Sequence, residues 1–269
     1  MDDHVAISYL RNRRATYFFG DAGPSLPAGL AARWRLSPSD PHGWQANMVG
    51  FIEGPPDRLG EVLDTAMNWF TPYGVDAWVD VDEYGVLFRH QELIDSRGFR
   101  LNDDWDAMLC RGLVRPELSS RIDLRFVQDK ADILTAAWIT EQTHRREPVT
   151  CDDAGVQRRM TRYWREHTDR QSSFVVATLD GQPAGTARVT NEELPVIVGV
   201  VTLPTARGRG VATAVTAALA LQALAEQGAC ALYAERGSQA ARIYRRLGFV
   251  PLFRMRTWVR PYVPIQSSR

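Results

Sequence analysis

The chain has 269 residues, 45% of them hydrophobic, and its 32 basic and 32 acidic side chains leave no formal net charge. A chain of this length and apolar content can bury a large core and is long enough for two domains. It contains no apolar run long enough to span a membrane, so we expect no association with a membrane. The low, odd number of cysteines and the absence of a signal peptide lead us to expect a cytoplasmic protein.

The residue types that most often ligate metals are dispersed along the chain. The five histidines show no ligand spacing and the three cysteines form no CxxC pair, so we expect no metal site. A G-x-S-x-G turn, which would carry a serine nucleophile, does not occur either. These histidines and cysteines are His4, His42, His90, His144, His167, Cys110, Cys151 and Cys230.

The charges are distributed unevenly over the two halves. Residues 1–116 carry 11 basic and 17 acidic side chains, whereas residues 117–269 carry 21 and 15. The basic half suits an anionic ligand, and the acidic half would repel nucleic acid, so we expect no nucleic-acid partner. The acidic half would also suit a cationic acceptor, although surface solubility explains it at least as well. Because Lys130 is the only lysine, the arginine bias points to a GC-rich bacterial genome.

The first half alternates between helical and strand patterns. A turn at 54–56 precedes a predicted helix at 57–70. Alternating apolar residues predict a strand at 77–81. A second helix is expected at 87–96, and Gly98-Phe99 would close it.

The second half contains a longer series of elements. Two stretches, 130–143 and 152–167, place apolar residues on one helix face. Asp180-Gly181 between alternating segments is a strong signal for a β-hairpin. The expected order is a strand at 122–127, the two helices, strands at 173–179, 183–190 and 194–203, a helix ending at Gly228, a strand at 230–234, a helix at 238–247 and a final strand.

The segment RGRGVA at residues 207–212, which we call the anion cradle, follows an apolar strand and leads into a helix-forming run. Gly208 and Gly210 allow a tight turn, so amide N–H groups can converge where the helix begins. The helix dipole and the guanidiniums of Arg207 and Arg209 would then favour a phosphate or pyrophosphate. A P-loop or a dinucleotide fingerprint would need other residues at these positions.

A second pattern lies downstream of the cradle. The text SQAARIYRRLGFVP predicts a helix that is capped by Ser238, closed by Gly248 and carries Tyr244 just before a Leu-Gly-Phe turn. Packing against Ile243 and Leu247 explains such a tyrosine by itself. A ring anchored in this way can also present its hydroxyl to a cleft, so the structural and catalytic roles are compatible.

The spacing Arg207-x-x-Gly210-x-Ala212 resembles the acyl-CoA pyrophosphate loop of the GCN5-related N-acetyltransferase (GNAT) family, usually written Q/R-x-x-G-x-G/A. The closing helix with Tyr244 and the element order β-α-α-β-β-β-α-β-α-β also resemble this family, over roughly residues 117–262. The resemblance implies an α/β fold with a mixed central sheet flanked by helices. Members often have asparagine where Ser238 stands, but serine can also cap the helix.

The resemblance also implies a site for acetyl-CoA or another acyl-CoA. In this fold the strand that ends near Leu203 parts from the strand at 230–234, and the pantetheine amides pair with the unpaired backbone. A backbone N–H there polarises the thioester carbonyl, and Tyr244 protonates the departing thiolate. The residues expected to bind the acyl-CoA are Val201, Thr202, Leu203, Arg207, Gly208, Arg209, Gly210, Val211, Ala212 and Ser238.

A base is needed because a protonated amine acceptor cannot attack the thioester. A carboxylate, or a water relay to one, would remove the proton. Glu192, Glu193 and Glu235 lie nearest in the sequence, and Glu193 is our candidate because it is closest to the strand. A solvated loop carboxylate is the commoner role for each of the three.

The first half carries a faint internal repeat of the second. FRHQELIDSRGFRLNDDWDAMLCRG and IYRRLGFVPLFRMRTWV both contain a helix, Gly-Phe and a strand with a methionine, Met108 or Met255. We therefore expect two GNAT-like domains, a degenerate copy at 1–116 and a catalytic copy at 117–269. The first copy has no cradle motif, so it should bind no CoA and shape the acceptor side. Trp44 is a candidate for lining an acceptor pocket there.

Two classes of function remain open. The first is a transferase that moves an acyl group from CoA to the amine of a small molecule or a protein. A variant of this class takes the acyl group from a carrier protein, and the cradle weighs against it because that donor lacks the adenosine diphosphate end. The second class is a non-catalytic acyl-CoA-binding or regulatory module, and Tyr244 favours the enzyme over it. No motif identifies the acceptor, the acyl group or the oligomeric state.

Overall fold

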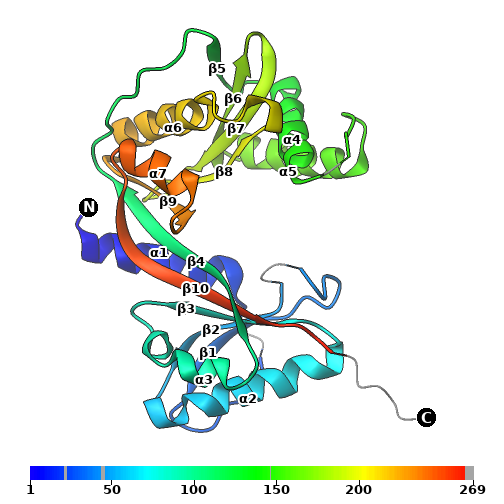
Figure 1. Cartoon of the computed structure of the whole chain (residues 1–269), viewed down its shortest axis with the longest axis vertical. Helices are drawn as coiled ribbons and strands as arrows, with labels where there is room; N and C mark the ends of the chain where they lie inside the picture. Colours follow the sequence, from blue (N-terminus) through cyan, green and yellow to red (C-terminus); the bar gives the residue numbers. More distant parts are fainter. Residues whose placement is uncertain (21–22, 44–45, 146, 264–269) are drawn as a thin grey trace. The chain divides into compact units, whose positions relative to one another are not determined.

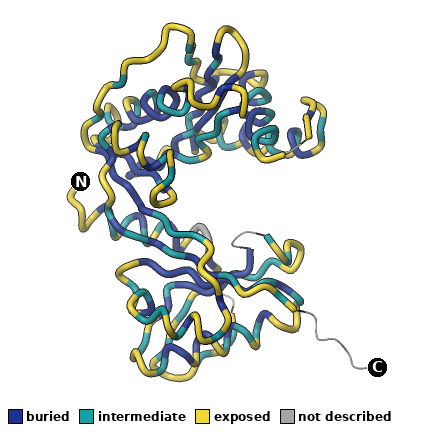
Figure 2. Tube along the Cα trace, viewed as in Figure 1, coloured by how far each residue is buried: buried dark blue, intermediate teal, exposed yellow. Residues whose placement is uncertain are grey.

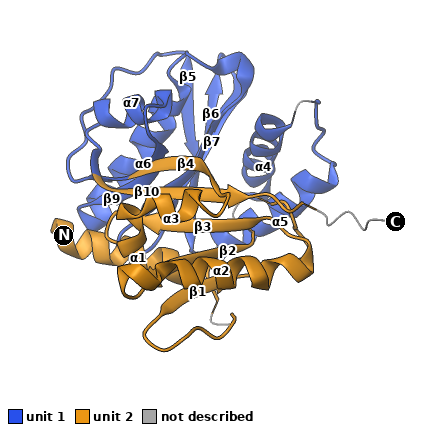
Figure 3. Cartoon of the chain, turned by 60° about the horizontal axis from the view of Figure 1, so that its bottom comes forward, with its two compact units in different colours: residues 1, 107–251 blue, residues 2–106, 252–269 orange. Residues whose placement is uncertain are grey.

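The computed structural model of the chain describes residues 1–20, 23–43, 46–145 and 147–263, so Trp44 lies outside the described residues. The chain divides into two compact units (Figure 3). Unit 1 contains Met1 and residues 107–251, and unit 2 contains residues 2–106 and 252–269.

Unit 2 is built on strands in the order β1-β2-β3-β10-β4. β2 and β3 are parallel because α2 connects them, whereas β10 runs antiparallel to β3. Leu59, Val62 and Ala66 recur at helical spacing on α2 and pack in one buried cluster with Trp258 of β10. The elements are α1 (Asp3–Phe18), β1 (Ala31–Arg35), β2 (Met48–Glu53), α2 (Leu59–Phe70), β3 (Ala77–Asp82), α3 (Gln91–Asp95), β4 (Arg100–Cys110) and β10 (Val250–Arg260).

Unit 1 contains strands in the order β4-β9-β8-β7-β6-β5. Side chains of β6 alternate between two cores, since Val175 and Ala177 pack with α6 and α7 while Phe174 and Val176 pack with α4 and α5. One helix pair therefore covers each face of the sheet (Figure 1). The elements are β5 (Ile122–Phe126), α4 (Lys130–His144), α5 (Ala154–Thr168), β6 (Ser172–Leu179), β7 (Gln182–Thr190), β8 (Val196–Thr202), α6 (Val211–Gln227), β9 (Cys230–Glu235) and α7 (Gln239–Arg246).

Two strands belong partly to each unit. Residues 107–110 of β4 lie in unit 1, and β10 continues in unit 2 from Leu252 onward. β10 pairs with β3 through to Arg260↔Ala77. The compact units therefore differ from the expected division after residue 116, because the last strand of the chain completes the sheet of unit 2.

Most elements of the second half agree with the sequence-based expectation, and the mixed α/β fold class is confirmed. Asp180 and Gly181 have φ of +53° and +75°, as a tight hairpin turn requires. Gly228, with φ of +72°, ends α6. In the first half, the helix expected at 87–96 is a 3-10 turn followed by the short α3. The sequence patterns gave no indication of α1, β1 or β2.

The segments that suggested an internal repeat have the same local structure. Gly98 follows α3 with φ of +76°, and Gly248 follows α7 with φ of +97°. The next residues, Phe99 and Phe249, are buried, and each leads into a long strand. The two halves therefore share a helix–glycine–phenylalanine–strand unit, while a common origin as domain copies stays a prediction.

Burial follows the strands of both units, and exposed residues mark most connections (Figure 2). β3 is buried along its whole length, so Asp80 and Asp82 are carboxylates in a core. Arg14 lies 2.5 Å from Asp80 and Arg11 lies 2.8 Å from Asp82, because buried carboxylates need partners. Burial raises the pKa of the Asp80 carboxyl, and the Arg14 guanidinium opposes this shift.

Candidate functional site

The anion cradle connects β8 to α6 through a 3-10 turn at Pro204–Ala206. Gly208 and Gly210 have φ of +74° and +89°, a left-handed conformation that favours glycine. Among the described residues no side chain caps α6, which begins at Val211. The N–H groups of its first turn are therefore available as donors to an anion.

A cavity of about 360 Å³ opens beside the cradle, within unit 1. Its second wall is one face of α7, since Gln239, Ile243 and Arg246 are spaced by four and three positions. Six residues predicted from the sequence line it, namely Thr202, Arg207, Gly208, Gly210, Val211 and Ala212. Sequence reasoning missed the lining residues Ala206, Thr213, Gln239, Ala240, Ile243 and Arg246.

The two guanidiniums of the cradle have different surroundings. Arg207 lines the cavity, and its Nε donates to the Thr202 carbonyl at 3.4 Å. Arg209 donates instead to the Asp180 carboxylate at 3.3 Å, on the hairpin between β6 and β7. Asp180 also accepts two bonds from Arg121, which holds the pKa of this carboxyl below its usual range. Arg209 is therefore shared with a carboxylate that would compete with an anion for it.

β8 and β9 separate as the resemblance implied. The two strands pair in parallel from Val196↔Ala231 to Ile197↔Leu232, and both strands continue beyond this paired stretch. Gly199 follows with φ of +64°, where the pairing of β8 with β7 is also irregular. A bulge of this kind bends the strand, so a gap opens between β8 and β9 on the side that leads to the cradle.

The three strand residues expected to contact the ligand are not equivalent. Thr202 lines the cavity, and its buried Oγ1 has no hydrogen-bond partner among the described residues. Leu203 is buried, its N–H donates to Ala184 O, and its carbonyl accepts from the Ala206 N–H, both at 2.9 Å. The expectation of pairing with a ligand backbone therefore rests on Val201 and Thr202 more than on Leu203.

Tyr244 lies on α7 and is 6% exposed. Its ring centroid is 6.1 Å from that of Phe249, and it shares a buried cluster with Ile197 and Leu232, the last paired residues before the gap. Burial raises the pKa of its hydroxyl to about 12, so the group stays protonated at neutral pH. A protonated hydroxyl is what a general acid needs, but Tyr244 is not among the residues that line the cavity, so its catalytic role stays a prediction.

Ser238 caps α7, because its Oγ accepts the Ala241 N–H at 3.1 Å. The next residues, Gln239 and Ala240, line the cavity, while Ser238 is not part of the cavity wall. Its expected role in binding acyl-CoA therefore stays a prediction, next to a capping role that the structure shows.

The candidate bases Glu193 and Glu235 lie at opposite ends of the parallel strands β8 and β9. Glu193 is exposed in the connection that precedes β8, whereas the cradle follows the end of β8. Glu235 is exposed at the end of β9, and its carbonyl accepts the Ser238 N–H. Glu193 is thus separated from the cradle by the length of β8. Its role as base stays a prediction.

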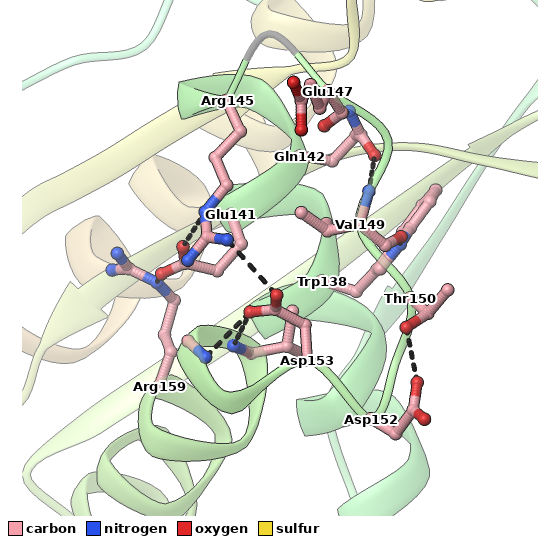
Figure 4. A network of polar contacts seen from close by, with 12 residues as sticks. Trp138, Glu141, Gln142, Arg145, Glu147, Val149, Thr150, Asp152, Asp153 and Arg159 are labelled. Atoms are coloured by element: carbon pink, nitrogen blue, oxygen red, sulfur yellow. Dashed lines mark hydrogen bonds and ion pairs between the residues drawn. The ribbon is translucent and has the colours of Figure 1, made fainter.

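The connection between α4 and α5 is tied to α4 by side chains (Figure 4). Trp138 Nε1 donates to the Val149 carbonyl at 2.8 Å, and Gln142 Oε1 accepts the Val149 N–H at 2.8 Å. These two hydrogen bonds hold Val149 through both its carbonyl and its N–H group.

A cluster of charged side chains joins the two ends of the same connection, at Arg145 and Asp153 (Figure 4). Glu141 on α4 receives Arg159 Nε at 2.6 Å and lies 3.4 Å from Arg145 Nε. Arg145 also contacts Asp153 at 3.2 Å, and Asp153 caps α5 through the Gly155 N–H at 2.7 Å. Because four charged side chains neutralise one another, this cluster holds α4 and α5 together rather than offering a free charge.

Two further findings bear on the expected class of protein. Within the residues that the structure describes, no group of histidines, cysteines and carboxylates is arranged to hold a metal ion. The described helices also include none that is both long and apolar enough to cross a membrane.

Comparison with known families and structures gives a consistent result. Residues 170–251 match the family model described as an acetyltransferase (GNAT) domain. This segment runs from the start of β6 to the start of β10 and includes the cradle and Tyr244. A search of curated proteins found no match.

Solved structures extend the similarity to nearly the whole chain. A GCN5-related N-acetyltransferase from Kribbella flavida is 18% identical, with a TM-score of 0.64 over 95% of each chain. One from Sphaerobacter thermophilus is 19% identical, with a TM-score of 0.66 over 96% of this chain and 86% of that one. A tandem GNAT protein from the clavulanic acid biosynthesis pathway is 14% identical, with a TM-score of 0.61 over 88% and 80%. At these identities the likeness is one of fold.

Proposed function

We propose that this chain, which contains an acetyltransferase domain of the GNAT family at residues 170–251, is an N-acyltransferase. It moves an acetyl or other acyl group directly from an acyl-CoA to an amine of a small molecule or a protein. The observation that carries the proposal is the cradle, whose uncapped helix end lines the same cavity as α7, beside the gap between β8 and β9. An acyl-CoA could then place its pyrophosphate at the start of α6 and its thioester in the gap between β8 and β9.

The cradle binds the pyrophosphate of the donor in this proposal. The N–H groups at 209–212 donate to its oxygens, and Arg207 adds a positive charge from the cavity wall. The pantetheine arm then lies along the open edge of β8, where Thr202 Oγ1 is buried without a partner. A hydrogen bond from a pantetheine amide would satisfy that hydroxyl.

In this proposal Tyr244 is the general acid of the chemical step. The neutral amine attacks the thioester carbonyl, and a backbone N–H of β8 stabilises the negative oxygen that forms. The C–S bond then breaks, the thiolate takes the proton of the Tyr244 hydroxyl, and the tyrosinate is reprotonated from solvent. The amine loses its proton to Glu193 or to water, so the products are an amide and free CoA.

Two alternatives make different predictions. A carrier-protein donor has no pyrophosphate, so it would leave the cradle without a ligand. A non-catalytic binding module would use the cradle but have no need of the Tyr244 hydroxyl. The retention of both features supports an enzyme that uses acyl-CoA.

The proposal is tested by incubating the chain with isotopically labelled acetyl-CoA and a library of small amines and peptides. Denaturing mass spectrometry should find at least one amine that gains the label, together with free CoA. The Tyr244→Phe variant, which keeps the ring, is the control and should form the same product much more slowly. Tight binding of acetyl-CoA without a labelled product from any amine would favour the non-catalytic module.

A further inference from the structure

Unit 2 contains an opening between two parallel strands like that in unit 1. The parallel pairing of β2 with β3 ends at Gly50↔Asp80, and both strands continue beyond this point. The next residue, Phe51, has φ of +51°, a conformation that is rare for an aromatic residue. Gly199 has φ of +64° at the matching place in β8. In both units, therefore, a left-handed residue marks the point where the strands separate.

The segment after the opening offers an anion fewer N–H donors than the cradle does. Where unit 1 has the anion cradle, unit 2 has Gly54-Pro55-Pro56, a 3-10 turn at Pro56–Arg58 and then α2. Two of these residues are prolines, which have no N–H to donate. Unit 2 thus has the strand opening without the donors that an acyl-CoA pyrophosphate needs, and a different ligand has to be considered.

A cavity of about 280 Å³ lies at this opening, entirely within unit 2. Since a water molecule occupies about 30 Å³, the cavity has room for roughly ten non-hydrogen atoms. Phe51 of β2 and Tyr84, which follows β3, give it aromatic walls, and Leu87 adds an apolar side chain. The space therefore suits a small molecule with an apolar body.

The charges around the cavity leave one carboxylate without a counter-ion. Asp80 is bound by Arg14 and Asp82 by Arg11, whose guanidinium also lies over the Tyr84 ring at 5.7 Å. Glu53, the exposed last residue of β2, lines the cavity as well, and among the described residues its side chain has no hydrogen-bond or ion-pair partner. Glu53 and Phe51 also line a neighbouring cavity of about 500 Å³, so the Glu53 carboxylate faces open space on two sides.

We propose that this cavity is a binding site for a small primary amine with an apolar or aromatic body. The ammonium group donates to the Glu53 carboxylate, a charge-assisted hydrogen bond. The rings of Phe51 and Tyr84 cover the apolar part of the ligand, while the Arg11 guanidinium already lies over the Tyr84 ring. An anion would meet the Glu53 carboxylate, which has no paired arginine, whereas Asp80 and Asp82 are already paired with Arg14 and Arg11, so an anion is disfavoured. The site does not depend on the proposed acyl transfer, because every residue that forms it belongs to unit 2.

The test uses the full chain and three probes of equal shape and different charge: benzylamine, benzyl alcohol and benzoate. Affinities are measured by NMR titration at neutral pH for wild type, Glu53→Gln and Glu92→Gln. Glu92 is an exposed carboxylate of unit 2 outside the cavity, so it controls for the general loss of a negative charge. CoA is titrated into the same samples to follow unit 1.

Benzylamine should bind wild type and Glu92→Gln equally, and at least tenfold more weakly to Glu53→Gln. The two other probes should bind wild type at least tenfold more weakly than benzylamine does. Equal benzylamine affinity for Glu53→Gln and wild type would overturn the proposal, as would tighter binding of benzoate or no binding of benzylamine up to about 10 mM. CoA affinity should be the same in all three proteins, so a failure here would leave the transferase proposal unaffected.

Discussion

Two substitutions of Gly210 distinguish the effect of charge on CoA binding from the effect of backbone shape. With φ of +89°, position 210 accepts asparagine more readily than most residues, and a Cβ there would meet Ile122 Cδ1 at an ordinary 3.5 Å. Gly210→Asn and Gly210→Asp add side chains of nearly equal size, and only the second adds a negative charge. At about 5 Å from a phosphate charge, that carboxylate costs about 3 kcal/mol at an effective dielectric constant of ~20 and about 1 kcal/mol in water.

Calorimetric titration with CoA should therefore show at least a tenfold loss of affinity for Gly210→Asp relative to Gly210→Asn. Raising the salt concentration should narrow the difference, because screening weakens repulsion near the surface. Equal affinities of the two variants would refute the assignment of the pyrophosphate to this helix start. A large loss in Gly210→Asn alone would show that backbone shape, rather than charge, controls binding.

Four further outcomes are expected. Tyr244→Phe should lower kcat by about 10²- to 10⁴-fold with little change in CoA affinity. Burial raises the pKa of Tyr244 from 10.0 to about 12, so the contribution of this hydroxyl to stability is complete below pH 10 and is lost as the pH rises to 12. Urea unfolding between pH 10 and 12 should therefore show a larger loss of stability for wild type than for Tyr244→Phe. Ser238→Ala removes the cap of α7 and should cost about 1 kcal/mol, seen as a fall in Tm of about 2–4 °C. Asp180→Asn releases Arg209 from an exposed ion pair, so CoA should bind up to about fivefold more tightly at low salt.

The features predicted correctly depend on neighbours in the sequence. Asp180-Gly181 specifies its hairpin through the φ that both residues adopt, and Gly228 and Ser238 end and begin helices through bonds to residues a few positions away. The local geometry of the cradle belongs to this class, because its glycines and the start of α6 form one local turn, while its role in binding an anion stays a prediction. Short-range chemistry of this kind is visible in a single sequence.

The features that were missed depend on contacts between distant residues. β10 follows α7 directly, yet it pairs with β3, which lies more than 160 positions earlier. The direction of Arg209 is set by Asp180 on a separate hairpin, so the sequence around the cradle could not show it. The face of α7 that lines the cavity could have been found from the sequence, because Gln239, Ile243 and Arg246 repeat at helical spacing. A polar helix face is also what exposure to solvent produces, so the pattern does not by itself indicate a site.

The central claim, that the cradle and the strand gap of unit 1 hold an acyl-CoA, is tested most directly by a crystal structure of the chain with CoA. The pyrophosphate should lie within hydrogen-bond distance of the N–H groups at 209–212, with the pantetheine arm along Val201 and Thr202 and the thiol near Tyr244. One CoA should be bound per chain, since unit 2 has no cradle. A pyrophosphate bound at any other helix start, or a second CoA in the opening between β2 and β3, would contradict the account.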